Sequence, residues 1–526
     1  MRSDQRYDAV RETLPMPVRI GGTAVALRTA DAVKWLALRS HPLFGALAAT
    51  TIPRWVEPLG ARGALRAALH ARRRVPAYRE YLQAHYWTDD RSLSGYERLL
   101  RLPIMDKHSY IERYPSADRC LDGRIPLRGT EMDESSGSSG TPFNWLRSHG
   151  ELHEVHLQLS KFARQVIGPE IVTINGFSMG AWSTGVNTAE ALKRNGLVKS
   201  PGPDLEKIIS TLRYLGPGYT YAITGYPPFL REILEYGTAE GLDWRQYLLY
   251  GVVGGEGMSE ALRARLLKSF AAVFSAYGAS DLDIGVAAET PTSIWVRQQA
   301  DRNPALRQAL FGDDSRLPML FQYNPLDYMV ETVNGELVIT VNRLCMLSPR
   351  IRYNIHDSGS SHSYQTVVEI CRGFGIDIET SPVATASPRF RLPFLYIQGR
   401  SDSTISYMGS NIYPEDIEQG LSTVAEYNDQ IRGFALELRE IGDGAVRPCV
   451  HVEFSDDASL EVETRLRTAI VERLLTNSRD FRAAAAENPT ATEFLIEVHR
   501  PGTGPFEENS RRIKRRYILR GPRAID

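Results

Sequence analysis

Residues 247–281 read YLLYGVVGGEGMSEALRARLLKSFAAVFSAYGASD, and this segment contains the pattern that decides the fold class. The run YLLYGVVGGE (247–256) is rich in β-branched and aromatic residues and ends in glycines, which is typical of a buried strand. A stretch with helical patterning, SEALRARLL, follows it and leads into a second apolar run, FAAVF. A strand, a helix and a further strand in this order predict a βαβ unit with parallel strands.

The same alternation extends over residues 100–400. Further β-branched runs are EIVTING (170–176), YAITGYP (221–227) and GELVITVN (335–342), and helical stretches separate them. This pattern predicts an α/β domain with a largely parallel sheet. Beyond Gly399-Arg400 the pattern becomes helix, strand, strand, helix, strand, which is typical of a compact α+β domain. We therefore expect a helical extension at 1–75, a large α/β domain at 76–398 and a small domain at 399–526.

The composition excludes several classes of protein. The chain has 526 residues, of which 42% are hydrophobic and 24% charged, with a formal net charge of −1, so it carries no overall electrostatic signature of a nucleic-acid-binding protein. Its 4 cysteines are scattered, so neither a disulfide framework nor a cysteine-based zinc site is expected. No apolar run is long enough to cross a bilayer, and a cytoplasmic location is expected.

The first 75 residues are rich in arginine and alanine. A cluster of arginines falls in the second helical stretch of this region, at Arg62, Arg66, Arg72, Arg73 and Arg74. Such a cluster is able to contact an anionic surface, either membrane lipid or a protein partner. A solvated helix face is the plainer interpretation.

Residues 134–142 read ESSGSSGTP and have two interpretations. Glycines permit left-handed backbone and close approach, so successive N–H groups can surround an anion, and serine hydroxyls add donors. The segment is not a Walker A loop, because no Gly-Lys-Ser/Thr follows. A flexible linker would have the same composition, but the position early in the α/β alternation favours a phosphate loop. Its candidate residues are Ser135, Ser136, Gly137, Ser138, Ser139 and Gly140.

Two carboxylates at strand ends are candidates for ligand binding. Asp281 closes SAYGASD (275–281) and is a hard oxygen donor suited to Mg²⁺, although a helix-capping role is equally compatible with its position. Asp357 follows the strand-like run after GELVITVN and is able to accept hydrogen bonds from both hydroxyls of a ribose. GRSD (399–402) lies at the domain boundary and is a hinge candidate.

Other polar and aromatic patterns carry less weight. His149, His153 and His156 are spaced to share one helix face, but no acidic or cysteine partner completes a metal site, so we interpret them as a polar helix face. The aromatic residues of NGFSMGAWSTG and TGYPPFL, Phe177, Trp182 and Tyr226, either line a substrate pocket or form strand-end core.

Taken in order, these motifs resemble the adenylate-forming superfamily of acyl-CoA synthetases and ligases, and in particular its phenylacetate–CoA ligase-like branch. The series runs SSGSSGTP (135–142), GGE (254–256), YGASD (277–281), RYNIHD (352–357), GRSD (399–402), IYPEDIE (412–418) and RRIKR (511–515). VPAYREYL (75–82) and LPIMDKHSYIERYP (102–115) also resemble segments of that branch. The likeness covers residues 75–520, so the N-terminal extension falls outside it.

The resemblance implies an α/β adenylation domain followed by a small mobile α+β lid, and a two-step reaction. A carboxylic acid attacks ATP to give an acyl-adenylate and pyrophosphate, and coenzyme A then takes the acyl group. By position, Ser135 to Gly140 would hold phosphates, and Asp357 and Arg400 the ribose. Asp281 would hold Mg²⁺ and Asp402 would be the pivot. The resemblance further implies that Gly255, Glu256, Tyr277 and Gly278 border the nucleotide, and that Phe177, Trp182, Tyr226 and Ala279 line the acyl pocket.

Two departures from the family pattern matter. Asp281 stands where the family usually has Glu, one methylene longer. The C-terminal element places Arg512 where the family has its catalytic lysine, with Lys514 two residues further on, so either cation is a candidate. An amine or other nitrogen acceptor, and a non-catalytic regulatory or binding role, stay open as alternatives. The sequence is silent on the acyl substrate and on oligomeric state, so a homodimer also stays open.

Overall fold

The structure is a computed structural model, and it describes residues 23–50, 53–135, 143–312, 317–383, 390–400, 405–427, 430–442, 445–455 and 460–507, together with Leu519. Its helices are α1 (Thr23–Arg39), α2 (His41–Thr50), α3 (Pro53–Arg74), α4 (Pro76–Ala84), α5 (Gly95–Leu100), α6 (His149–Val166), α7 (Ser183–Leu192), α8 (Leu205–Leu215), α9 (Pro227–Ala239), α10 (Glu260–Leu266), α11 (Pro291–Arg302), α12 (Pro304–Phe311), α13 (Tyr364–Gly373), α15 (Pro414–Ser422), α16 (Leu460–Asn477) and α17 (Arg479–Glu487).

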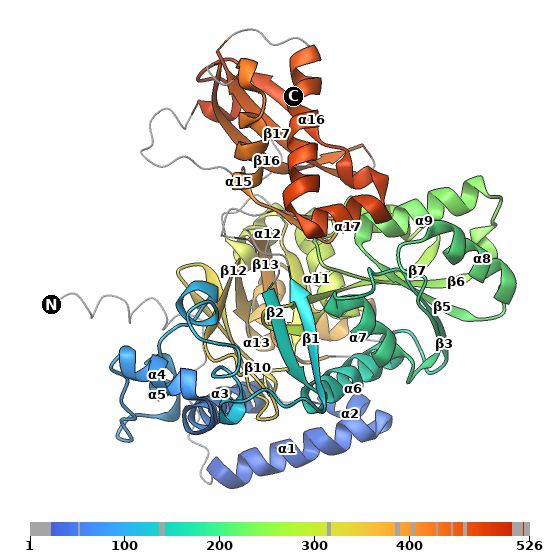
Figure 1. Ribbon diagram of the computed structural model, residues 1–526. Helices are drawn as coiled ribbons and strands as arrows, with labels where there is room; N and C mark the ends of the chain where they lie inside the picture. Colours follow the sequence, from blue (N-terminus) through green and yellow to red (C-terminus); the bar gives the residue numbers. More distant parts are fainter. Residues whose placement is uncertain are drawn as a thin grey trace.

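The strands divide between a large lower domain and a small upper domain (Figure 1). They are β1 (Thr130–Ser135), β2 (Phe143–Ser148), β3 (Ile171–Asn175), β4 (Gly196–Lys199), β5 (Thr220–Gly225), β6 (Leu248–Gly254), β7 (Phe270–Ala279), β8 (Asp283–Ala288), β9 (Met319–Tyr323), β10 (Tyr328–Val333), β11 (Glu336–Val341), β12 (Tyr353–His362), β13 (Phe394–Arg400), β14 (Ile405–Tyr407), β15 (Ser410–Ile412), β16 (Ile431–Ile441), β17 (Ala445–Phe454) and β18 (Leu495–His499).

The large domain is built on an 11-stranded sheet with the order β10-β11-β12-β13-β9-β8-β7-β6-β5-β3-β4. The predicted βαβ unit is confirmed: β6 and β7 pair in parallel, and α10 connects them after a cap in which the Ser259 side chain accepts from the Leu262 N–H. The five strands from β3 to β7 pair in parallel.

The expectation of a largely parallel sheet needs correction for the other half. From β7 to β10 along the sheet every neighbouring pair is antiparallel. Short turns such as those between β7 and β8 and between β10 and β11 allow only antiparallel pairing, whereas a parallel crossover needs a connection of about a dozen residues or more. The α/β class is unaffected.

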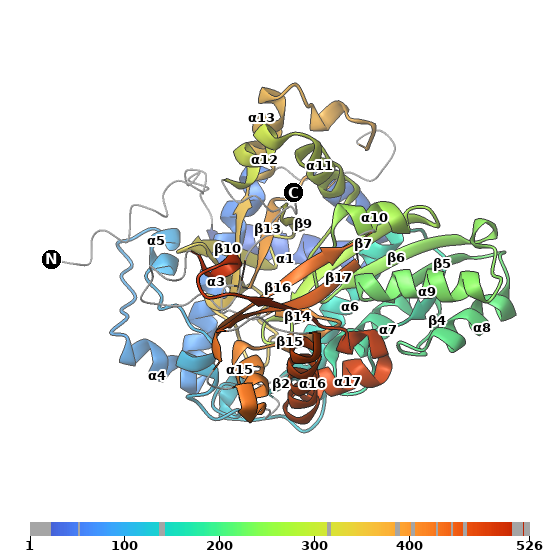
Figure 2. The ribbon, with the colours of Figure 1, turned by 90° about the horizontal axis from the view of Figure 1, so that it is seen from above.

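Helices cover the sheet in groups. Seen from above, α8 and α9 flank the parallel strands, while α11, α12 and α13 gather over the antiparallel part (Figure 2). The second group forms its own apolar core with β9 and β13, through Val296, Leu306, Val367 and Phe394. The main core joins the parallel strands, whose side chains are buried on both faces in β3, to the helices α3 and α4.

Helix α3 packs closely against the loop between β9 and β10 and against the end of β11. Its buried face is made of small residues, among them Ala64, Ala68 and Ala71, and a Cβ placed at Gly60 would lie 2.2 Å from the backbone oxygen of Pro325. The Asn342 side chain donates to the Gly60 carbonyl at 3.0 Å. The alanine-rich composition of this region is therefore what lets the helix approach the strands.

The small domain has a three-stranded sheet of order β16-β17-β18, in which β16 and β17 are antiparallel and β17 and β18 parallel. Helices α15, α16 and α17 pack on one face, and the core includes Ile417, Leu436, Val450 and Ile470. The predicted succession of helix, two strands, helix and strand is confirmed, while α17 and the short β14–β15 pair were not predicted. Strand β13 ends in the large sheet at Arg400, and from Ile405 onward side chains pack in this separate core.

Candidate active site

The carboxyl ends of the parallel strands meet at one edge of the large sheet, where open α/β sheets bind ligands. Phe177 follows β3 and Tyr226 follows β5, and their rings pack edge to face with centroids 5.6 Å apart. Gly255 and Glu256 follow β6. Gly255 has φ +85°, and a Cβ there would lie 2.7 Å from the Tyr226 ring, so only glycine fits this position.

Tyr277 and Asp357 come from opposite halves of the sheet and meet. The Tyr277 hydroxyl on β7 donates to Asp357 Oδ2 on β12 at 2.5 Å, and the Asp357 carboxylate is buried. Asp357 is also the register partner of Arg400 on β13. The structure thus brings together two residues that the resemblance assigns to the nucleotide site. Gly278, next to Tyr277, allows β8 to lie against β7, because a Cβ there would lie 2.2 Å from the Ile284 carbonyl.

Asp281 lies in the turn between β7 and β8, just beyond Ala279. Its side chain accepts a hydrogen bond from the Tyr353 hydroxyl at 2.9 Å, and Arg350 Nε donates to its backbone carbonyl at 2.6 Å. The side chain is half-buried, and no helix follows it, so the helix-capping interpretation is excluded. A single partly exposed carboxylate fits Mg²⁺, which retains several waters and binds through one or two carboxylates together with substrate phosphates.

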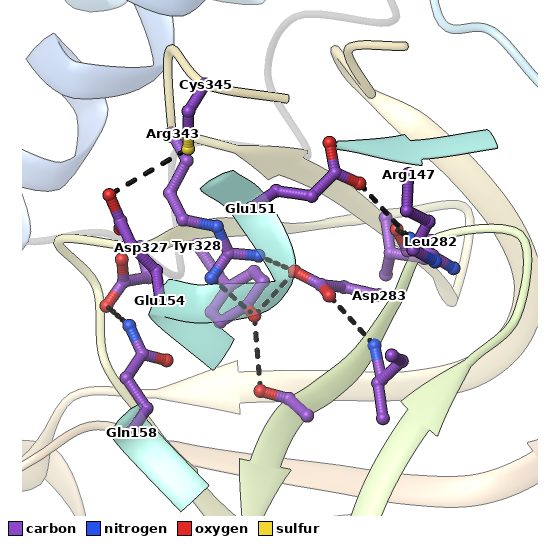
Figure 3. Close-up of polar contacts among 12 residues, drawn as sticks. Arg147, Glu151, Glu154, Gln158, Leu282, Asp283, Asp327, Tyr328, Arg343 and Cys345 are labelled. Atoms are coloured by element: carbon purple, nitrogen blue, oxygen red, sulfur yellow. Dashed lines mark hydrogen bonds and ion pairs between the residues drawn. The ribbon is translucent and has the colours of Figure 1, made fainter. Parts of the chain in front are cut away.

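A buried polar network contacts the turn between β7 and β8 (Figure 3). Arg147 on β2 donates to the backbone carbonyls of Ser280 at 2.5 Å and Leu282 at 3.4 Å, and to Asp133 Oδ2 on β1 at 2.9 Å. One guanidinium therefore holds both the base of the β1–β2 hairpin and the turn that carries Asp281.

Deeper in the same network, Asp283 pairs with Arg343 and accepts from the Tyr328 hydroxyl at 2.9 Å (Figure 3). Tyr328 in turn accepts from Arg343 Nη1 at 3.2 Å. All three side chains are buried, and the ion pair compensates the cost of taking the carboxylate out of water. The start of β8 is thereby fixed.

The serine- and glycine-rich segment connects the two strands of a hairpin. β1 and β2 pair antiparallel from Thr130–Ser148 to Ser135–Phe143, so the segment between them joins neighbouring strands rather than two domains. Ser135 Oγ accepts from Trp145 Nε1 at 2.7 Å. The backbone of β1 also contacts Trp182, since Glu134 and Trp182 form a bridge. Ser136, Gly137, Ser138, Ser139 and Gly140 lie outside the described residues.

A pocket of about 120 Å³ lies between the two domains at this edge. The large domain lines it with Ser135, Trp182 and Tyr226, all predicted from sequence. The small domain closes it with residues that were not predicted, Met408, Gly409, Asn411 and Asp480. The sequence around these residues resembles the start of the lid. Which large-domain residue each of them contacts depends on how the two domains are apposed, so these contacts could not be predicted.

Three glutamates hold the two domains together. Met408 donates its N–H to Glu256 Oε2 at 2.9 Å, and burial raises the pKa of Glu256 to about 8. Glu232 on α9 accepts from Thr490 Oγ1 at 2.9 Å and from the Asn488 side chain. Burial raises the pKa of Glu232 as well.

The third glutamate of this group, Glu487 at the end of α17, accepts from the Ser178 hydroxyl of the large domain. Burial raises its pKa too. Carboxyls whose pKa is raised by burial tend to mark functional sites, and here they mark the contact between the domains.

Several other predicted features can be placed. Phe177 is buried behind Tyr226 rather than lining the pocket, and Ala279 packs against the main core at the end of β7. Asp402, Arg512 and Lys514, and the side chain of Arg400, lie outside the described residues.

The three histidines of α6, predicted to share a polar helix face, differ in their surroundings. His156 is buried and hydrogen-bonded to the Asn187 side chain at 2.7 Å, and His149 stacks with His153. Within the described part of the chain, the groups of side chains able to hold a metal ion all lie elsewhere.

The arginine cluster is engaged within the chain. Arg74 forms two hydrogen bonds of 2.5 Å with Asp122, Arg66 pairs with Asp31, and Arg72 lies over the Trp87 ring. These contacts support the plainer interpretation, a helix face that packs and pairs locally. Among the described helices none is long and apolar enough to cross a membrane.

Comparison with solved structures finds the same fold in 2-hydroxyisobutyryl-CoA ligase. The complex with 2-HIB-AMP and CoA in the thioesterification state has a TM-score of 0.60 at 16% identity, covering 90% of this chain and 91% of that chain. The postadenylation state in complex with 2-HIB-AMP has a TM-score of 0.51 at 15% identity, covering 90% of this chain and 92% of that chain. No protein-family profile and no curated protein sequence matches. The chain thus shares the fold of this ligase, an α/β domain followed by a small α+β domain, as predicted.

Proposed function

We propose that the protein is an AMP-forming ligase that activates a carboxylic acid as its acyl-adenylate, releases pyrophosphate and transfers the acyl group to coenzyme A. The observation that carries the proposal is one interdomain pocket, lined by Ser135 and Tyr226 of the large domain and by Met408 and Gly409 of the small domain. Met408 also donates its N–H to Glu256. The residues around this pocket come from motifs that are up to about 270 residues apart in the chain and that belong to the series resembling the family.

The nucleotide would lie along the carboxyl edge of the sheet. Asp357, which accepts from the Tyr277 hydroxyl, would accept from the ribose hydroxyls together with its register partner Arg400. Gly255 and Glu256 would border the base, and the hairpin residues Ser135 to Gly140 would surround the β- and γ-phosphates. Fixed donors of this kind stabilise charge that develops on phosphoryl oxygens without reorganising in the transition state.

Asp281 would hold Mg²⁺, which neutralises charge on the transferring phosphate oxygens when it is bound. The rigid support of the β7–β8 turn by Arg147 and Arg350 suits this role, because a positioned carboxylate loses little entropy on binding. Arg512 or Lys514 would supply the cation that meets the α-phosphate during adenylation.

The acyl group would enter the pocket beside Trp182 and Tyr226, which its lining supports. Domain rotation about Asp402 would exchange the adenylation surface of the small domain for its thioesterification surface. Coenzyme A is proposed as the acceptor because 2-hydroxyisobutyryl-CoA ligase, which shares this fold, was solved in complex with CoA in the thioesterification state. The four unpaired cysteines fit a reducing, cytoplasmic location.

The test is ATP–pyrophosphate exchange over a panel of aliphatic, hydroxylated and aromatic acids. At least one acid is expected to support exchange, and Asp281→Asn is expected to lower its rate while the matched surface change Asp301→Asn leaves it unaltered. Absence of exchange and of AMP release with every acid would overturn the ligase proposal.

A second measurement identifies the acceptor and the cation. Mass spectrometry of products formed with coenzyme A or with amines distinguishes acyl-CoA from amide, and exclusive amide formation would replace coenzyme A in the proposal. Arg512→Ala and Lys514→Ala are expected to differ sharply in adenylation rate, and equal, negligible effects would contradict a catalytic role for either.

A further inference from the structure

One face of the small-domain sheet carries polar side chains that the proposed reaction does not use. They occupy alternate positions on three adjacent strands: Glu437 and Arg439 on β16, Cys449 and His451 on β17, and Glu497 and His499 on β18. His451 is the register partner of Glu497, so side chains from β17 and β18 stand beside each other. The intervening residues, such as Val450 and Ile496, face the core on the other side.

Three donor atoms of this face form a compact triangle. His451 Nδ1 and His499 Nε2 are 2.8 Å apart, and Glu497 Oε2 lies 3.5 Å from the first and 3.8 Å from the second. Ligands bound tetrahedrally to Zn²⁺ at about 2.0–2.2 Å lie about 3.3–3.5 Å from one another, so small side-chain adjustments bring all three donors to bonding distance. We propose that His451, His499 and Glu497 bind a Zn²⁺-class divalent transition-metal ion, with water in the fourth position.

The surroundings of His451 fit this assignment. With Nδ1 on the ion, Nε2 carries the ring proton and faces the buried carboxylate of Glu437, whose Oε1 lies 3.2 Å away. A carboxylate behind a metal-binding imidazole fixes its tautomer and makes it a better ligand. Arg439 is held by Glu437 at 2.8 Å and by Glu497, so the charged groups of the face leave a net negative charge for the ion.

The second group of possible ligands around His451 is a poorer site. Glu437 and Cys449 surround its Nε2, with the sulfur 3.8 Å away. Arg439 Nη2 lies 3.2 Å from His451 Nε2 and 3.1 Å from Glu497 Oε2, so this guanidinium does not distinguish the two groups, whereas accessibility does. Cys449 is also completely buried, whereas the Glu497 side chain is 42% exposed and gives the ion a path to the His499 side.

The proposed ion would tie β17 to the last residue of β18. The chain leaves β18 at His499 toward residues 500–526, which include Arg512 and Lys514. Metal binding would therefore stabilise the small domain at the point from which this segment departs. The inference concerns the fold of the small domain and does not depend on the ligase activity.

The test uses the full-length protein, stripped with a chelator and reloaded with Zn²⁺ or Co²⁺. We expect one equivalent of metal to remain after gel filtration, measured by elemental analysis, and a Co²⁺ absorption band of a four-coordinate site. His499→Ala and Glu497→Gln are expected to weaken Zn²⁺ binding at least about tenfold. Zn²⁺ should raise the melting temperature of the unaltered protein but not that of His499→Ala.

The double variant His149→Ala/His153→Ala is the matched control, because these histidines are spaced i, i+4 on one helix and are the obvious competing site. It should retain one equivalent of metal. His499 and Glu497 are partly exposed, so their variants are expected to fold, which circular dichroism checks. Failure of the unaltered protein to retain metal, or undiminished binding by the folded His499→Ala variant, would overturn the proposal.

Discussion

Gly409 shows how closely the two domains approach at the level of one atom. It has φ +78°, and a Cβ there would lie 2.1 Å from the Tyr226 hydroxyl. Gly409→Ala is expected to separate the domains locally and to lower acyl transfer at least about tenfold. ATP–pyrophosphate exchange should change less, because the proposed domain rotation gives adenylation another arrangement of the domains.

Gly375→Ala is the matched control for this prediction. Gly375 has a similar φ of +74°, but nothing lies within 4 Å of the position that an added methyl group would take, so this variant carries the backbone strain without the clash. Stopped-flow or single-turnover measurement of both half-reactions compares the two variants. Equal losses in both variants would attribute the effect to backbone strain alone.

The Tyr277–Asp357 contact makes a second prediction at this scale. Asp357→Asn is expected to lower kcat/KM for ATP about ten- to hundredfold, because hydrogen bonds to a charged group are worth about 1.5–3 kcal/mol. Tyr277→Phe keeps the carboxylate but removes its donor and should have a smaller effect in the same direction. Steady-state kinetics with varied ATP measures both. Tyr214→Phe, at an exposed tyrosine, is the control, and an unaltered kcat/KM in Asp357→Asn would remove this residue from the nucleotide site.

At the scale of elements, helix α1 is attached to the large domain by a buried ion pair. Lys34 contacts Asp327 and lies 3.0 Å from Glu154, and Asp327 also accepts from Gln158 at 2.9 Å (Figure 3 shows the carboxylates and Gln158). Burial disfavours the ammonium, but the two carboxylates outweigh it and raise the pKa of Lys34. The helix is thus tied to the same network that supports the active-site turn.

Removing this lysine should be costly. Lys34→Ala leaves Asp327, whose side chain is fully buried, without its cation and is expected to lower the free energy of unfolding by about 3–5 kcal/mol. Arg66→Ala breaks an exposed ion pair with Asp31 in the neighbouring region and should cost only about 0–1 kcal/mol. Urea denaturation compares the two. A loss for Lys34→Ala no greater than that for Arg66→Ala would mean that α1 is held by apolar packing alone.

Patterns within short stretches of sequence predicted the helices and strands that depend only on periodicity and composition within those stretches. The βαβ unit at 247–281 and the order of elements in the small domain follow from periodicity and composition. The antiparallel pairing beyond β7 was not predicted. Strand direction there depends on short turns, which the sequence pattern did not distinguish from longer connections. The Lys34–Asp327 pair joins residues 293 positions apart, and no periodicity predicts such a contact.

For the molecule as a whole, the raised pKa of Glu256 makes domain apposition depend on pH. With the domains apposed its pKa is about 8, and in a solvated carboxyl it returns to the ordinary value of 4.5. Below pH 4.5 Glu256 is protonated in both the apposed and the separated state, and its contribution to the stability of the apposed state is complete. As pH rises toward about 8, the separated state loses its proton first, so apposition weakens. Glu232 and Glu487, also raised, act in the same direction.

We therefore expect a larger apposed fraction at pH 6 than at pH 9, measured by small-angle scattering or by fluorescence transfer between labels on the two domains. Glu256→Gln should flatten this dependence, since the amide does not titrate, while Glu206→Gln on the exposed surface should leave it intact. An opposite slope, or an unaltered one in Glu256→Gln, would contradict a role for this carboxyl.

At the same scale, only the large-domain residues of the candidate site could be predicted from the sequence. Trp182 and Tyr226 follow strands of the large domain, and their position at the sheet edge could be inferred from alternation and resemblance. Met408, Gly409 and Asp480 face them only because the small domain is apposed. Apposition of two separately folded cores depends on surface complementarity across the whole interface, which has no local sequence signal.

Arg147 connects two separate segments of the candidate active site, the β1–β2 hairpin and the β7–β8 turn. Its guanidinium donates to Asp133 in the hairpin and to the carbonyls of Ser280 and Leu282 in the turn. A displacement of the hairpin would therefore also displace the turn. Together with Arg350, Arg147 therefore holds the turn that carries Asp281, the proposed Mg²⁺ ligand, beside the hairpin that carries the proposed phosphate loop. In the proposed rotation of the small domain, the hairpin and the turn would therefore keep their positions relative to each other.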